Sequence, residues 1–333
     1  MTDCKNVIYS FVSYRRNIKD MPFVNKLSDT EQAIGVCRSL SEIFGDDYEF
    51  KMLKNLPLTE CLKLEEKNVI TKELIENKDI SAFALNGQGC IVLINEEDHI
   101  RLISKKDGFC LEDCFTLANQ MDDIVLDKLE MSFNNNLGYL TAKLEKVGTG
   151  LECGCLLFIP ALFSSEKAQK TINEITDTTF EVLNINGTKY DNTSPFVLIK
   201  NRYTFGFKEN QIAEKVQKVI EKLISLEVLE ENNLFNISAS TLVDKIYRSY
   251  GVVLNCYRLS ENEAIEKLGL ILWGIKLNIL KFVKKFDIFA FIAKIKENHL
   301  KNGSENIKDT QKKRAKICSN KVLECIVKGE VDV

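Results

Sequence analysis

The strongest constraint on the fold is a change of pattern part-way along the chain. Up to about residue 207, short apolar runs typical of strands alternate with helical stripes, whereas almost every later segment has helical periodicity. Strands with helices, followed by helices alone, predict an α+β domain and then a smaller all-helical one. The strand-like runs are Asn6–Ser13, Ser81–Leu85, Cys90–Asn95, Leu151–Phe158, Thr178–Ile185 and Phe196–Phe207.

The boundary between the two predicted domains lies in a polar run. An amphipathic helix is expected over Glu209–Leu229, and Glu230-Glu231-Asn232-Asn233 breaks its pattern. We therefore expect one domain over residues 1–230 and a second over residues 231–333. Helices are expected in the second over Ser238–Tyr250, Glu261–Val283, Asp287–Leu300 and Asp309–Val327. In the first, Asn86-Gly87-Gln88-Gly89 predicts a hairpin turn between two strands.

Composition excludes several classes of protein. The start of the chain lacks a signal-peptide pattern, and the longest apolar stretch, Leu268–Val283, contains Lys276 and Lys281, so we expect a cytoplasmic protein that does not enter a membrane. Eleven cysteines are then expected to be reduced, and His99 and His299 lie too far apart to predict a metal site. A net charge of −3 gives no general attraction to nucleic acid.

Arginine is scarce among the basic residues. Only eight of the 45 are arginine, and codon bias in an AT-rich genome is the simplest explanation. Arginine and lysine are not equivalent where phosphate is bound, because only arginine offers a planar pair of donors.

Four stretches could carry chemistry, and each also has an ordinary structural interpretation. Asn95–Arg101 places three carboxylates, a histidine and an arginine at a strand end, either as a solvated turn or as a general base beside an anion-binding arginine. The glycine-rich segment 138–151 is either a turn or a source of amides for phosphate. Gly251 in Tyr247–Val252 could cap a helix. Lys312–Lys316 is typical of a solvated helix face.

Together these stretches resemble one family, the bacterial protein-arginine kinases, which are relatives of the phosphagen kinases. The matching segments also include Pro22-Phe23, Ala118-Asn119-Gln120, Pro160-Ala161-Leu162 and Asn255-Cys256, in order along almost the whole chain. The resemblance implies a phosphagen-kinase-like catalytic domain, with an antiparallel sheet flanked by helices, and a helical domain for dimerisation and recognition. It implies transfer of the ATP γ-phosphoryl group to arginine side chains, with Mg²⁺. The partners it implies are a zinc-finger activator, a heat-shock repressor and a Clp ATPase, and the expected assembly is a homodimer.

The resemblance assigns Glu97 as the catalytic carboxylate and Arg101 as one of five arginines around the nucleotide phosphates. The family's Ser-Ser-Arg-x-Arg strand reads Tyr9-Ser10-Phe11-Val12-Ser13 here, which leaves Ser10 and Ser13 as candidate nucleotide contacts. Four of the five arginines are replaced, by Phe11, Ser13, Glu152 and Leu183. Because none of these residues is basic, codon bias does not explain the losses. In the motif that the family links to phosphoarginine, only Arg314 and Ala315 remain.

These losses predict an impaired enzyme. Two opposite charges about 4 Å apart attract by roughly 4 kcal/mol at an effective dielectric near 20, and each 1.4 kcal/mol is about tenfold in rate. Compensation by Arg15, Lys143 or Lys146 is the counter-argument. Arg15 shares a strand face with Phe11 and Ser13, and the other two replace part of the family's acceptor segment. Three hypotheses remain: a pseudokinase acting through binding, an active kinase with a rebuilt phosphate site, and a guanidino-compound binder that uses no ATP.

Overall fold

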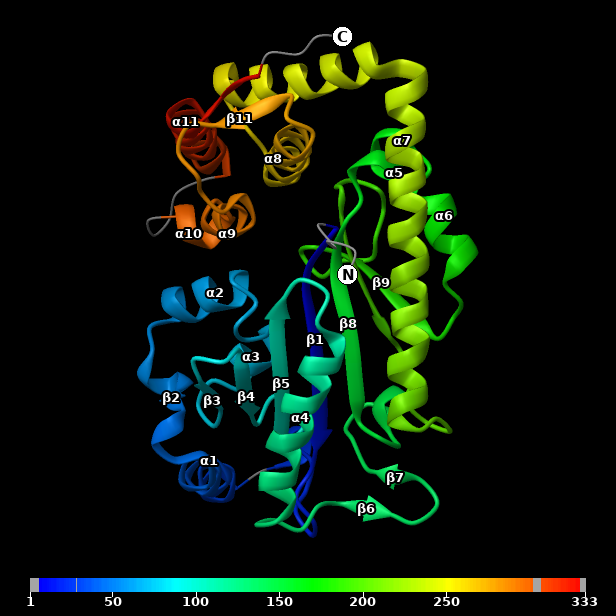
Figure 1. The fold of residues 1–333 in the computed structure, drawn as a ribbon. Helices are drawn as coiled ribbons and strands as arrows, with labels where there is room; N and C mark the ends of the chain where they lie inside the picture. The colour runs from blue at the N-terminus through cyan, green and yellow to red at the C-terminus, as the bar shows by residue number, and fades with distance from the viewer. Residues whose placement is uncertain (1–5, 28, 302–306, 330–333) are drawn as a thin grey trace. The chain divides into compact units, whose positions relative to one another are not determined.

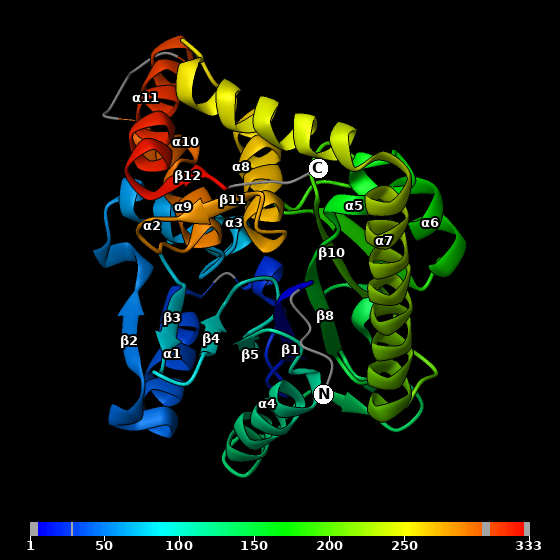
Figure 2. The ribbon, with the colours of Figure 1, turned by 45° about the horizontal axis from the view of Figure 1, so that its top comes forward.

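The computed structural model describes residues 6–27, 29–301 and 307–329 (Figures 1 and 2). The chain packs into two units that interleave in sequence. The first contains the chain up to Leu157 together with Ile175–Leu183 and Leu198–Lys222. The second contains Phe158–Glu174, Asn184–Val197 and the chain from Leu223 onward. The domain boundary expected at residue 230 stays a prediction.

The main element is an eight-stranded sheet. Its strands are β1 (Val7–Arg16), β2 (Glu49–Met52), β3 (Ala82–Leu85), β4 (Cys90–Ile94), β5 (Ile100–Asp107), β8 (Leu151–Phe158), β9 (Phe180–Asn184) and β10 (Phe196–Asn201). They lie in the order β2-β3-β4-β5-β1-β8-β10-β9, and each neighbouring pair from β2 to β8 is antiparallel. β6 (Phe133–Asn134) and β7 (Gly138–Tyr139) form a separate hairpin.

Helices cover both faces of the first part of this sheet. On one face, α1 (Thr30–Phe44) and α4 (Leu111–Leu126) bury side chains that include Leu40 and Met121 against Val92 and Ile94. On the other, α2 (Leu58–Glu66) and α3 (Lys72–Glu76) pack against Leu93. Consecutive residues of a strand point to opposite faces, so β4, which is apolar at every position, serves both cores.

The second unit is mainly helical. Its helices are α5 (Pro160–Ser164), α6 (Ala168–Ile175), the later part of α7 (Glu209–Asn255), α8 (Glu261–Lys276), α9 (Ile288–Lys294), α10 (Glu297–Leu300) and α11 (Ile307–Cys325). A two-stranded sheet of β11 (Leu280–Phe282) and β12 (Ile326–Lys328) was not expected. Within the described ranges, no helix combines the length and apolar character needed to cross a membrane.

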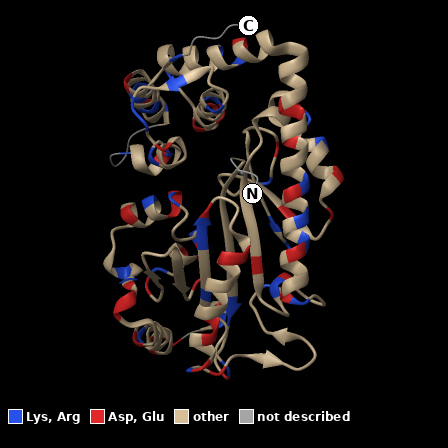
Figure 3. Cartoon of the chain, viewed as in Figure 1, with Lys and Arg blue, Asp and Glu red and all other residues tan. Residues whose placement is uncertain are grey.

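The break expected at Glu230–Asn233 is wrong, because α7 runs through it. Glu230 pairs with Lys167 at 2.8 Å, and Glu231 accepts a 2.7 Å hydrogen bond from the indole Nε1 of Trp273. These tertiary contacts satisfy the carboxylates while the backbone stays helical. The only non-helical residue inside α7 is Ser238. Figure 3 shows acidic and basic residues interspersed along this helix.

Other expectations about helices and strands are confirmed in some places and wrong in others. The hairpin of β3 and β4 and the strand Leu151–Phe158 are confirmed. The helix expected to continue to Val283 ends at Lys276, and the chain then enters β11. Gly251 does not cap a helix, because it lies inside α7, four residues before its end.

Candidate functional site

The loop from Asn95 to His99, between β4 and β5, is fixed by its own side chains. Asn95 has a positive φ of 57°, and its side-chain amide donates to the carbonyls of Ala33 and Ile80. One oxygen of Asp98 accepts hydrogen bonds of 2.6 Å from the Asn17 amide and 2.7 Å from a backbone N–H. The loop is therefore held in one conformation, and it is not a solvated turn.

His99 is part of the same support. Its Nδ1 accepts a hydrogen bond of 3.0 Å from the backbone N–H of Ile18, and its Nε2 lies 2.9 Å from the carbonyl of Pro22. These contacts require a neutral ring with the proton on Nε2. Burial lowers the pKa of His99, in agreement with a neutral structural role.

Glu97 is the one carboxylate of this loop that remains partly accessible. Its side chain is 17% exposed, whereas those of Glu96 and Asp98 are 1% exposed. Lys143 Nζ lies 2.6 Å from one Glu97 oxygen, and a guanidinium nitrogen of Arg15 lies 3.3 Å from the other. Both oxygens of the predicted catalytic carboxylate are thus paired with cations of the chain itself.

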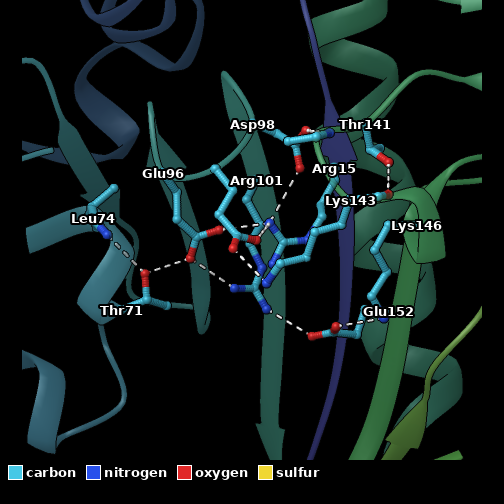
Figure 4. Close-up of polar contacts among 12 residues, drawn as sticks. Arg15, Thr71, Leu74, Glu96, Asp98, Arg101, Thr141, Lys143, Lys146 and Glu152 are labelled. Atoms are coloured by element: carbon cyan, nitrogen blue, oxygen red, sulfur yellow. Dashed lines mark hydrogen bonds and ion pairs between the residues drawn. The ribbon is translucent and has the colours of Figure 1, made fainter. Parts of the chain in front are cut away.

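Arg101 is held between two buried carboxylates (Figure 4). One of its terminal nitrogens lies 3.0 Å from Glu96, and the other lies 2.9 Å from Glu152. Glu96 also accepts a 2.6 Å hydrogen bond from the Thr71 hydroxyl. Burial raises the pKa of Glu96, but Arg101 and Arg15 outweigh it and hold the value at about 2.

Glu152 lies in β8, at a position where the resemblance places an arginine. It is 2% exposed, and three cations contact its carboxylate: Arg101 at 2.9 Å, Lys146 at 2.9 Å and Lys200 at 3.3 Å. Burial acts to raise its pKa, but these cations hold the pKa well below its usual value. Glu152 is therefore an ionised anion surrounded by positive charge.

These contacts form one network, which we call the charge network. Its ion pairs span 2.6–3.4 Å, and it joins five cations to five carboxylates. The members are Arg15, Arg101, Lys143, Lys146, Lys200, Glu96, Glu97, Asp98, Glu152 and Glu181. The formal charges balance, so the network carries no net positive charge that would attract a phosphate group.

The three cations expected to compensate for the missing arginines are all engaged by carboxylates. Arg15 does share a strand face with Phe11 and Ser13, as expected, and lies opposite Arg101. Its guanidinium is committed to three carboxylates of the loop. Lys143 and Lys146 are likewise paired with Glu97 and Glu152. Lys200, the third cation on Glu152, was missed because nothing near it in the sequence signals a site.

Ser10 and Ser13 point to opposite faces of β1, so the structure does not bring them together. Ser10 Oγ donates to the Gly108 carbonyl at 2.8 Å and accepts from the Cys110 N–H at 3.0 Å. Ser13 lies opposite Glu152 in the register. Its Oγ is buried and has no hydrogen-bond partner within the part of the chain that the structure describes.

The glycine-rich turn is used for close packing. A Cβ on Gly138 would lie 2.5 Å from the carbonyl oxygen of Gly148, and one on Gly150 would lie 2.6 Å from that of Arg15. The amides of Tyr139 and Gly148 bond each other's carbonyls at 2.7 and 3.1 Å. Those two amides are therefore engaged within the protein, which favours the ordinary turn.

The two remaining candidates are not members of the charge network. Leu183 is in β9, two strands from β8 in the sheet order. Arg314 is in α11 and is 3% exposed; its guanidinium donates to the carbonyls of Ile295 and Leu259 at 2.8 and 3.0 Å. Arg314 thus ties segments of the second unit together.

A pocket of about 170 Å³ lies on the sheet beside the charge network. Three of the five positions to which the resemblance assigns arginines line it, namely Phe11, Arg101 and Glu152. Lys105 and Lys200 line it as well, and neither was predicted. Within the described ranges, no group of histidine, cysteine and acidic side chains is arranged to hold a metal ion.

Comparison with known proteins gives two adjoining family matches. Residues 34–230 match the family described as "ATP:guanido phosphotransferase, C-terminal catalytic domain". Residues 239–325 match "Protein-arginine kinase McsB C-terminal domain". A protein-arginine kinase of Clostridium acetobutylicum is 30% identical over 317 residues, which cover 91% of this chain and 93% of that one. That of Shouchella clausii is 29% identical over 84% of this chain and 80% of its own.

Solved structures agree on the fold. Lombricine kinase superposes with a TM-score of 0.60 at 18% identity, over 70% of this chain and 69% of that one. The duplicated taurocyamine kinase of Schistosoma mansoni gives 0.60 at 19% identity, over 77% of this chain and 40% of its own. At this identity the likeness shows the fold alone, and it confirms the expected phosphagen-kinase-like α+β architecture.

Proposed function

The chain belongs to the ATP:guanido phosphotransferase family, among the protein-arginine kinases, and from this premise we propose that it is a catalytically impaired member that acts through binding. One observation carries the proposal. The chain's own side chains occupy both charged positions that the resemblance gives to substrates. Glu152 takes the place of an anion among Arg101, Lys146 and Lys200, and Lys143 takes the place of a cation at Glu97.

Binding of a substrate is opposed more strongly at the phosphate position near Arg101 than at Glu97. Glu152 is fixed in a buried strand, and a nucleotide phosphate near Arg101 would meet its negative charge at close range. At 4 Å and an effective dielectric near 20, this repulsion is about 4 kcal/mol, of the same size as the attraction that an arginine there would provide. Replacing an arginine by this glutamate therefore weakens phosphate binding twice.

Binding of a substrate guanidinium at Glu97 is opposed less strongly. Lys143 is 51% exposed, and ion pairs with an exposed lysine are worth about 0–1 kcal/mol. A substrate guanidinium could therefore displace Lys143 from Glu97. The Glu97 carboxylate therefore stays accessible to an arginine side chain even where phosphoryl transfer is lost.

The proposed role is regulation in protein quality control. A zinc-finger activator, a heat-shock repressor or a Clp ATPase is the proposed partner class, and a homodimer is the proposed assembly. ATP with Mg²⁺ is a ligand only under the alternative, an active ATP-dependent protein-arginine kinase. Retention of Glu97 on a fixed loop favours that alternative, and one set of measurements decides between the two.

The test combines binding with chemistry. Mg·ATP is titrated calorimetrically into the full chain, and phosphoarginine is assayed on a basic model protein. We expect no ATP binding at 1 mM nucleotide, on the order of the highest ordinary KM values, and no phosphoarginine. Phosphoarginine that disappears in Glu97→Gln would establish the active kinase and overturn the proposal.

Glu152→Gln tests the reason for the impairment. Removing this anion leaves three cations around a neutral amide, so pyrophosphate should bind at least about tenfold more tightly than to the unchanged protein. Glu181→Gln is the matched control, because Glu181 pairs with Lys200 but is 41% exposed. Equal pyrophosphate affinity in the two variants would show that Glu152 is not what excludes phosphate.

A further inference from the structure

The pocket beside the charge network is apolar on most of its lining. Phe11, Ile91, Leu93, Ile103 and Leu198 all contribute to it, from four strands of the sheet. Its volume of about 170 Å³ is close to the ~150 Å³ of a cavity known to take one benzene ring. A single ring or a short branched chain therefore fits inside it.

Lys105 is the exceptional cation of this pocket. It lies directly opposite Phe11 in the register of β1 and β5, on the face that the pocket occupies. Its Nζ is 3.9 Å from the centre of the Tyr9 ring, which positions the ammonium group. No carboxylate lies within ion-pair distance of Lys105 among residues 6–27, 29–301 and 307–329. Burial lowers the pKa of Lys105, and the charge of Asp107 acts in the opposite direction.

The other cations of the pocket are already neutralised. Arg101 pairs with Glu96 and Glu152, and Lys200 pairs with Glu152 and Glu181. Lys105 is therefore the one cation of the pocket without an ion pair among the described residues, and Asp107, two residues farther along β5, acts on it only at longer range. A single carboxylate of a ligand would pair with its ammonium group, whereas a triphosphate would bring an excess of negative charge.

We propose that this pocket binds a small apolar monocarboxylate, with the carboxylate on Lys105 Nζ and the ring or branched chain against Phe11, Ile103 and Leu198. The pocket combines one cation without an ion pair among the described residues, a largely apolar lining and a volume that suits one ring. It does not depend on whether phosphoryl transfer survives. The phenylalanine that replaces a family arginine is then part of a new binding surface as well as a loss from an old one.

Benzoate is the probe, and benzylamine, which carries a positive charge on a similar ring, is its control. Each is titrated into the full chain by calorimetry, with binding located by ¹³C-methyl NMR of the isoleucines. We expect benzoate to bind, to shift the methyl signals of Ile91 and Ile103, and to leave Ile271 of the second unit unchanged. Benzylamine should not bind. Absence of benzoate binding at 20 mM, or shifts confined to other methyl groups, would overturn the proposal.

Substitutions test the role of the ammonium group. Lys105→Met keeps the apolar stem and should weaken benzoate binding by at least about tenfold, the loss expected for one charge-assisted hydrogen bond. Lys105→Arg keeps the charge and should stay within about threefold of the original affinity. Lys106→Met is the matched control, since Lys106 is the next residue on the strand and pairs with Asp113. Unchanged affinity in a folded Lys105→Met protein would refute the assignment, and the ATP experiment above would be unaffected.

Discussion

In the loop between β4 and β5, four side chains hold the loop conformation and only Glu97 keeps an accessible carboxylate. Asn95 and His99 form hydrogen bonds with the backbone, and Asp98 accepts from Asn17, a backbone N–H and Arg15. Glu96 is buried against two arginines. A motif can therefore be retained for two separate reasons at adjacent residues, loop conformation and chemistry. Sequence comparison does not separate the two.

Alanine substitutions at Ser13 and Ser10 should have different effects on the free energy of unfolding. Ser13 Oγ is buried without a partner among the described residues, so Ser13→Ala should keep or raise the free energy of unfolding, by up to about 1 kcal/mol. Ser10→Ala removes three hydrogen bonds, with Gly108, Cys110 and Cys155, and should lower it by about 1–2 kcal/mol. Urea denaturation measures both. A clear loss of stability in Ser13→Ala would show that its hydroxyl has a partner in solution.

Among the elements, the short helix α5 has its N-terminus capped by a carboxyl group from α7. Glu227 is fully buried, and its two oxygens accept hydrogen bonds of 2.8 and 2.9 Å from the N–H groups of Ala161 and Leu162. Burial raises the pKa of Glu227 to about 8, although the two amides act in the opposite direction. The start of α5 thus depends on one side chain 66 residues away in the sequence.

Glu227→Ala should therefore destabilise the second unit. It leaves two buried N–H groups without an acceptor, and the expected loss in free energy of unfolding is about 2–4 kcal/mol. Glu214→Ala, at an exposed position on the same helix, should change it by less than about 0.5 kcal/mol. Equal effects of the two substitutions would mean that α5 does not need this cap. Circular dichroism during urea denaturation gives both values.

Elements differ in how well the sequence predicts them, and the reason is physical. β3, β4 and β8 were predicted because apolar runs and turn residues are local signals. The continuity of α7 was missed because Glu230 and Glu231 resemble a solvated break until Lys167 and Trp273 are placed beside them. Long-range partners override local preference at such positions.

On the scale of the whole molecule, the charge network should make stability sensitive to acid. The folded-state pKa of Glu96 is about 2, below its ordinary value of 4.5, so its contribution is present above pH 4.5 and is lost as pH falls towards 2. A shift of this size corresponds to roughly 3 kcal/mol. We expect the urea midpoint to fall steeply between pH 4.5 and 2.

Variants separate this effect from general acid denaturation. Glu96→Gln should be less stable at neutral pH and should show a shallower fall between pH 4.5 and 2. Glu130→Gln is the control, because Glu130 pairs with Lys19 on the surface and is 79% exposed. If Glu96→Gln and the unchanged protein lose stability in parallel, the network is not the origin of acid sensitivity.

The fold followed from the sequence more completely than the site did. Motifs in order along the chain were enough to identify the α+β architecture, and strand alternation correctly placed Arg15 beside Phe11 and Ser13. The pairing of Glu152 with Lys146 and Lys200 was not predictable, because these side chains meet across different segments of the folded chain. Sequence showed which cations were lost, and the structure shows what the remaining ones contact.

The surroundings of Glu152 also determine what would follow if this residue were replaced by arginine. An arginine restored there alone would lie among Arg101, Lys146 and Lys200, so that single step would replace three attractions by three repulsions. An arginine at position 13 would instead lie opposite Glu152 in the register of β1 and β8, where a counter-ion is already present. The order of the two substitutions therefore decides whether each added charge meets a counter-ion or is repelled by its neighbours.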